Sequence, residues 1–210
     1  MPSLRAKRSN PESGKDWIAS SLTLLAMTTY SRSVNAGGQM HAELDKVVAA
    51  VKEFYASEAF LFAHDLGERT LTHRLAVHLE KQFPDFTVDC DFDRLGPRTL
   101  NLPRGSIVST DDHLGKSVYP DIVVHQREVP NNLLAIEVRR EGNHQPVEHD
   151  RQKLRALTDA HAWFAYWIGA LVTLGKTGVS SPEVYVAGKA DVELSRFLAE
   201  RLKEAGLSAG

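Results

Sequence analysis

The chain has 210 residues, of which 42% are hydrophobic and 25% are charged, and its formal net charge is −2. A chain of this length can bury a full hydrophobic core, and we expect one domain with short appendages. The near-neutral charge excludes the strongly basic surface that drives non-specific nucleic-acid binding, so any contact with nucleic acid must be local. A single cysteine, Cys90, excludes an intramolecular disulfide framework and favours a reducing compartment, which indicates a cytoplasmic protein.

Residues 1–39 differ from the rest of the chain because they are rich in serine, threonine and basic residues and carry no periodic apolar face. We expect a disordered arm here, with Met40 as a candidate for the true start of the protein. A signal peptide is the alternative, because residues 34–36 resemble a cleavage site after a weakly apolar stretch. The longest apolar stretch, residues 17–27, is too short to span a bilayer, so we expect no membrane contact.

Two amphipathic helices are predicted after this arm. Apolar side chains recur at helical spacing over residues 44–54 and again over residues 71–83. Asp65 and Glu68 have the spacing of a capping box at the start of the second helix, and Pro84 ends it.

Strands and helices alternate in the remainder of the chain. Residues 86–93 alternate apolar and acidic side chains, which predicts a half-buried strand with an acidic outer face. Residues 95–117 have the composition of a long loop. Further strands are predicted at residues 119–125, 133–139, 164–174 and 183–187, and further helices at residues 148–160 and 192–205. We therefore expect a mixed α/β domain over residues 40–210.

Two carboxylates stand inside apolar runs, Asp121 in YPDIVVH and Glu137 in NNLLAIEVRR. By the two-residue period of a strand, one face of the second run carries four residues, Leu133, Ala135, Glu137 and Arg139. If the two strands pair as a hairpin, Asp121 and Glu137 lie side by side at one end of the sheet. Two neighbouring carboxylates in apolar surroundings need a cation between them, and oxygen ligands of this kind suit Mg²⁺ or Mn²⁺.

The Pro-Asp pair at residues 120–121, followed by Glu-Val-Arg at residues 137–139, resembles the signature of the PD-(D/E)XK nuclease superfamily. The order of predicted elements over residues 68–174 is also similar, and the two segments look like small bacterial and phage proteins of unknown function in that group. The resemblance implies a restriction-endonuclease-like fold, which is an α/β fold with a mixed sheet flanked by helices and the core order α-β-β-β-α-β.

The resemblance further implies a metal-dependent hydrolase that cleaves DNA, with Mg²⁺ or Mn²⁺ as cofactor. Asp121, Glu137 and the backbone carbonyl of Val138 would be the metal ligands. Glu68, on the helix upstream, would join the catalytic residues, together with Asp121, Glu137 and Arg139. Arg139 stands where members of the superfamily usually have lysine.

Arginine at this position changes the expected chemistry. Phosphodiester hydrolysis needs a metal ion and a further cation that orients the attacking water and offsets developing charge. Arg139 can supply the charge, but its planar guanidinium holds a phosphate differently from an ammonium group, and Lys153 on the following helix is a second candidate. Two functions stay open: a nuclease weakened by the arginine, or a catalytically silent module that binds nucleic acid or protein and retains the fold.

Several polar residues nearby also have simpler explanations. Glu68 can cap its helix instead of binding metal. Asp89 and Asp91 are expected on a solvated strand face, and His125 is expected at the surface or in a loop, because no two histidines have the spacing of a zinc site. The arginines within residues 94–104 are expected to solubilise the loop, with a rim that contacts phosphates as the alternative.

Overall fold

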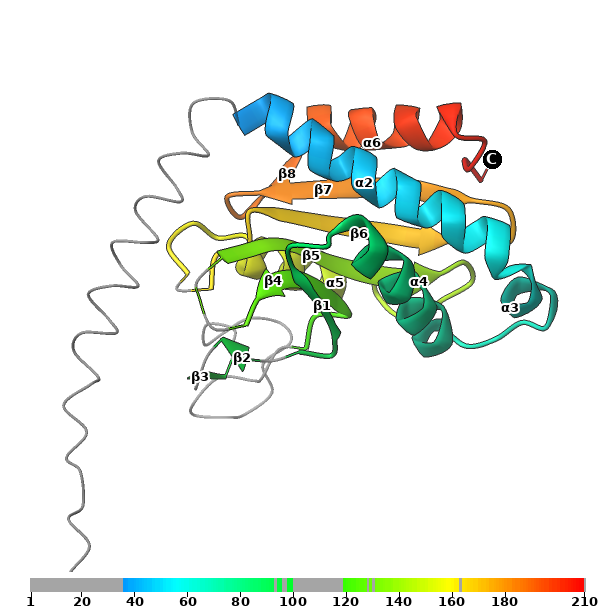
Figure 1. Cartoon of the computed structure of the whole chain (residues 1–210), viewed down its shortest axis with the longest axis horizontal. Helices are drawn as coiled ribbons and strands as arrows, with labels where there is room; N and C mark the ends of the chain where they lie inside the picture. Colours follow the sequence, from blue (N-terminus) through cyan, green and yellow to red (C-terminus); the bar gives the residue numbers. More distant parts are fainter. Residues whose placement is uncertain are drawn as a thin grey trace, which may run out of the picture.

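The structure is a computed structural model, and it describes residues 36–92, 94–95, 98–99, 119–127, 129, 131–162 and 164–209. Its centre is a mixed sheet of six strands in the order β1-β4-β5-β6-β7-β8 (Figure 1). These strands are β1 (Thr87–Cys90), β4 (Ile122–Gln126), β5 (Asn131–Arg140), β6 (Ile168–Leu174), β7 (Val179–Val186) and β8 (Lys189–Asp191). The helices are α2 (Ala36–Ser57), α3 (Ala59–Ala63), α4 (Glu68–Gln82), α5 (Glu148–Leu157) and α6 (Val192–Glu204).

The sheet lies between two helical layers, with α2, α4 and α6 on one face and α5 on the other (Figure 1). Side chains of β5 alternate between the two layers. Leu134 and Ile136 belong to the large apolar cluster beneath α2, α4 and α6, whereas Ala135 packs with Leu154 and Leu157 of α5. Because both faces are covered, β5 is buried along nearly its whole length.

The predicted mixed α/β sheet with flanking helices is confirmed. Strands β4 and β5 pair antiparallel as a hairpin, and β5 pairs parallel with β6 after a crossover through α5. The sequence patterns did not predict the short helix α3 or the strand β8. Most of the predicted loop at residues 95–117 lies outside the described residues. In the part of it that is described, Leu95 belongs to β2 (Arg94–Leu95), which pairs antiparallel with β3 (Arg98–Thr99), so this part is not a loop as predicted. The side chains of the predicted arginine rim also lie outside the described part.

Helix α4 begins without the predicted capping box. Its N-cap is Gly67, and no side chain forms a capping hydrogen bond there. Asp65 has a positive φ of 57°, and its carboxylate pairs instead with Arg140 at the end of β5. The capping prediction is therefore wrong, because the carboxylate is used in a tertiary contact.

A β-bulge changes the face of one residue on β5. The register shifts between Val124 and His125, so Leu133 has no partner in the ladder. Leu133 packs in the large cluster with Leu134, while Glu137 keeps the face of Ala135. The prediction that Leu133 shares a face with Glu137 is therefore wrong.

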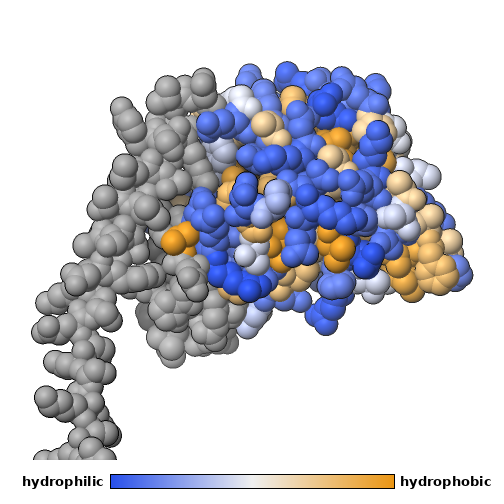
Figure 2. All heavy atoms as spheres, viewed as in Figure 1, coloured by the Kyte–Doolittle hydropathy of each residue, from blue (hydrophilic) through white to orange (hydrophobic). Residues whose placement is uncertain are grey.

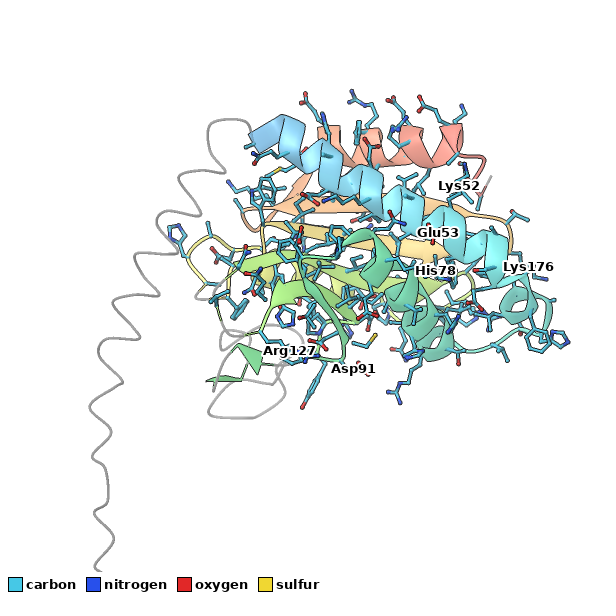
Figure 3. The ribbon with its side chains drawn as sticks, in the orientation of Figure 1. Lys52, Glu53, His78, Asp91, Arg127 and Lys176 are labelled. Atoms are coloured by element: carbon cyan, nitrogen blue, oxygen red, sulfur yellow. The ribbon has the colours of Figure 1, made fainter. Side chains whose placement is uncertain are left out.

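His125 and Asp89 form a polar contact between β4 and β1. The side chain of His125 is fully buried, and its Nε2 lies 2.9 Å from Asp89 Oδ2. Arg127, labelled beside this part of the sheet in Figure 3, holds the same carboxylate from the outside. The predictions of a surface histidine and of a solvated Asp89 are both wrong, whereas Asp91 is exposed as expected.

The chain before Met40 is described only from Ala36, where α2 begins. The prediction of a disordered arm otherwise lies outside the described residues. None of the helices in the described part is long and apolar enough to cross a membrane. The face shown in Figure 2 is largely hydrophilic, and apolar atoms gather at its right edge over α3, where Phe60 is 63% exposed.

Candidate functional site

Charged side chains gather where β4 begins and β5 ends. The carboxylates are Glu68, Asp121, Glu137 and Asp150, and the cations are Arg139 and Lys153. They come from α4, from the residue before β4, from β5 and from α5. The fold therefore brings together residues that are far apart in the chain, including both acids of the predicted motif.

Asp121 is fixed by the backbone of the neighbouring strand. The N–H of Val138 donates a hydrogen bond to Asp121 Oδ2 at 2.8 Å. Burial raises the pKa of the Asp121 carboxyl, and the ammonium of Lys153 opposes this rise. Its negative charge in turn helps to raise the pKa of Glu137, which agrees with the predicted proximity of the two carboxylates at one end of the sheet.

The carboxylate of Glu137 is fully buried and contacts the ammonium of Lys153. Its Oε1 has no hydrogen-bond partner among the described residues. Burial, and then the charge of Asp121, raise the pKa of the Glu137 carboxyl well above its usual value, although Lys153 opposes them. Burial would lower the pKa of the Lys153 ammonium, but the charges of Glu137 and Asp121 outweigh it and raise this pKa. The ammonium therefore stays charged beside an acid that ionises reluctantly.

Arg139 lies on β5, but its partners lie in the following loop and at the start of α5. Its guanidinium pairs with Asp150 at the start of α5 and donates hydrogen bonds to the carbonyl oxygens of Gln145 at 2.5 Å and Asn143 at 3.3 Å. Its side chain is only 9% exposed. These partners, and not the carboxylates of Asp121 and Glu137, hold the guanidinium, so Arg139 ties the end of β5 to α5.

Glu68 occupies the first position of α4 and reaches the end of β5. Its Oε2 accepts hydrogen bonds from the N–H of Arg140 at 2.8 Å and from the side-chain amide of Asn143 at 2.7 Å. The simpler explanation of Glu68 as part of a capping box does not hold, because the cap of α4 involves no side-chain hydrogen bond. Glu68 instead locks the start of α4 against the strand that carries Glu137.

Lys153 reaches Glu137 because α5 packs closely on the sheet. Gly169 of β6 pairs with Ala135 of β5 beneath this helix. A Cβ atom at Gly169 would lie 2.9 Å from Thr158 Cγ2 and 3.2 Å from Leu154 Cδ2, so a larger residue would push the helix outward. Ala135 and Gly169, small residues on adjacent strands, therefore allow α5 to lie close to the sheet, and this distance determines whether Lys153 can contact Glu137.

Sequence reasoning named Lys153 only as a second candidate and missed Asp150 and Asn143. The available signal for Lys153 was its position next to Leu154, a buried residue of α5, which indicated that this part of the helix packs on the sheet. Asp150 sits in the first turn of α5, where an acid is favoured by the helix dipole alone. Nothing local in the sequence distinguishes that common use from its ion pair with Arg139.

A cleft of about 560 Å³ lies beside the carboxylates. It is lined by Glu68, Arg69, Thr70, Thr72, His73, Cys90, Asp91 and Asp121. Asp91 marks its border at the end of β1, at the lower side of the view in Figure 3. Because Glu68 and Asp121 belong to both the cleft and the charged cluster, the cleft is the route by which a ligand can approach the acids.

The donors of the cluster fit a hard divalent cation. These donors are carboxylate oxygens, the ligand type that such ions prefer. Glu137 Oε1 lacks a hydrogen-bond partner among the described residues, and the cluster contains four carboxylates for two cationic side chains. In the described part of the chain, no three His, Cys, Asp or Glu side chains converge closely enough to hold a metal ion. Asp121 and Glu137 alone therefore offer few protein ligands for such an ion, and the ammonium of Lys153 already contacts Glu137.

Comparisons of the chain with protein-family models, with curated proteins and with solved structures find no match. The resemblance to PD-(D/E)XK nucleases thus depends on the motif at residues 120–121 and 137–139 and on the arrangement described above.

Proposed function

We propose that this chain is a metal-dependent nuclease of the PD-(D/E)XK type, with a restriction-endonuclease-like fold, that hydrolyses phosphodiester bonds of DNA. One observation carries the proposal: Asp121, directly before β4, and Glu137, on the adjacent strand β5, both interact through their carboxylates with the ammonium of Lys153. The order α4, β1, β4, β5, α5, β6 supports it, because these elements follow the expected pattern α-β-β-β-α-β.

Asp121, Glu137 and the carbonyl of Val138 would hold Mg²⁺ or Mn²⁺, with Glu68 beside them. Such an ion, when bound, polarises a phosphoryl oxygen and lowers the pKa of water. The hydrogen bond from Val138 orients Asp121, and the partners of Glu68 fix α4 at the edge of the cleft. The site residues are thereby held in place before any ligand arrives.

Lys153, and not Arg139, is the cation that would contact the phosphate in this proposal. Its side chain is 17% exposed, so the ammonium can face both Glu137 and an incoming phosphate. Beside the reacting group it offsets the negative charge that develops on the phosphoryl oxygens. Arg139 acts indirectly as a positioning residue. It forms an ion pair with Asp150, which lies one helical turn before Lys153 and also contacts it.

Cleavage of supercoiled plasmid and of single-stranded DNA tests the proposal, with Mg²⁺, with Mn²⁺ and with EDTA. We expect cleavage with a divalent ion, none in EDTA, and a rise in melting temperature with Mn²⁺, as for any ligand that binds the folded state. Asp121→Asn and Glu137→Gln should lose both effects. Glu200→Gln, which alters an exposed acid on α6, is the matched control and should lose neither. Wild-type protein with no cleavage and no Mn²⁺ shift would refute the proposal.

A catalytically silent domain that binds nucleic acid is the second candidate. It is favoured by the ion pair itself, because the ammonium of Lys153 already neutralises the buried carboxylate of Glu137. In that case Mn²⁺ leaves the melting temperature unchanged and nucleic-acid binding persists without cleavage.

A further inference from the structure

One wall of the cleft carries hydrogen-bond donors that have no partner among the described residues. Arg69 and His73 both line the cleft from α4, and both are exposed. Neither side chain has a hydrogen bond or an ion pair with any residue that the structure describes. The cleft therefore places these donor groups of α4, unpaired within the described part of the chain, next to the carboxylates of Glu68 and Asp121.

Local contacts explain why Arg69 has no ion pair among the residues that the structure describes. Its neighbour Glu68 is the nearest acid along the helix, but that carboxylate already accepts hydrogen bonds from Arg140 and Asn143. Arg69 and His73 are four positions apart on a helix, which places their Cβ atoms about 5–6 Å from each other on one face. Two donors at this separation can hold the oxygens of one anionic ligand, and the fork of an arginine matches a phosphate group.

We propose that Arg69 and His73 bind a backbone phosphate of the nucleic-acid strand, next to the phosphodiester at the carboxylate cluster. The exposed hydroxyl of Thr70 lies on the same wall and can donate a further hydrogen bond. The substrate class rests on the proposed function, and the new element is the path of the strand along the first turns of α4. Contacts of this kind position a strand without reading its bases, so binding through them tolerates changes of sequence.

Binding of a fluorescein-labelled single-stranded oligonucleotide to the full chain, in EDTA and at several salt concentrations, tests the inference. Arg69→Ala should weaken binding about tenfold, as loss of one charged hydrogen-bonded contact does. The log–log salt slope should fall by about 0.7, the value for one phosphate contact on a single strand. His73→Ala should act in the same direction, and Arg69→Lys should keep the slope while losing part of the affinity.

The matched control is Arg196→Ala, which removes an exposed arginine of α6 that has no ion pair with the described residues. Helix α6 packs on β7, which is separated from β1 by three strands of the sheet. Binding that falls with Arg69→Ala and not with Arg196→Ala supports the inference, even if the protein never cleaves DNA. Equal losses in both variants, an unchanged Arg69→Ala variant, or no binding by the wild type would overturn it, even where metal-dependent cleavage is present.

Discussion

Lys153, on α5, places its ammonium against the fully buried carboxylate of Glu137, on β5. The cation of the candidate site thus comes from a helix, and the acids come from the neighbouring strands. Because Glu137 has no exposed surface, its charge depends on Lys153 or on a cation that replaces it. The proton affinity of Glu137, the proposed metal binding and the position of α5 therefore all depend on this contact.

Replacing Lys153 by methionine separates catalysis from metal binding. Lys153→Met keeps the length of the side chain and removes the charge, so we expect cleavage to fall by a factor on the order of 10²–10³, as after loss of a preorganised stabilising group. The Mn²⁺ thermal shift should persist or grow, because an ion no longer competes with the ammonium for Glu137. Cleavage at the wild-type rate would remove Lys153 from the mechanism.

Local patterns predicted the elements that carry the acids, because helical and strand periodicity in α4, β4 and β5 follows directly from which side chains are buried. The cation was harder to predict. The contact of Lys153 with Glu137 depends on how closely α5 approaches β5, which Gly169 allows from a third strand. His125 was misplaced for a similar reason, since its burial depends on Asp89 from another strand.

The role of Arg139 was also beyond a pattern-based prediction. Its residue type and strand position match the motif, but its partners lie in the loop and helix that follow. A strand period fixes the face from which a long side chain leaves, and does not fix where its guanidinium ends.

Arg139→Ala should destabilise the fold. Among the described residues, the substitution leaves Asp150 with only its longer contact to Lys153, at 3.9 Å, and removes the donor to the carbonyls of Asn143 and Gln145. We expect the free energy of unfolding to fall by about 3–5 kcal/mol, as when one partner of a buried ion pair is removed. Arg139→Lys should lose less, because an ammonium can still reach Asp150. Urea denaturation measures both, and Arg201→Ala, which breaks an exposed pair with Asp45, should change little. A small loss with Arg139→Ala would contradict the tethering role.

Removing the chain before Met40 should leave stability nearly unchanged. Met40 is the first buried residue of α2, and the three residues that precede it are exposed. A truncated chain that begins at Met40 should therefore melt within a few degrees of the full chain. A shorter chain that begins at Asp45 loses Met40 and the fully buried Leu44, and it should melt at a clearly lower temperature. Equal melting of these two truncated chains would show that the start of α2 contributes no packing.

Glu137 should make the stability of the metal-free protein fall as the pH rises. Its pKa in the folded state is raised above the usual value of 4.5, so over the interval between these two values the folded state binds more protons than the unfolded state. The contribution is fully present below the unfolded pKa and is lost as the pH rises through the folded one.

Asp121 acts in the same direction, whereas Glu58, Asp89 and Glu183 have lowered pKa values and act in the opposite one. The difference between wild type and Glu137→Gln therefore isolates the buried acid. In EDTA, we expect the variant to gain melting temperature relative to the wild type as the pH rises from 4.5. The Mn²⁺ shift of the wild type should grow over the same range, because the metal binds the ionised carboxylate. If the melting temperatures of the two proteins change with pH in parallel, Glu137 keeps one protonation state over this range, and the prediction is wrong.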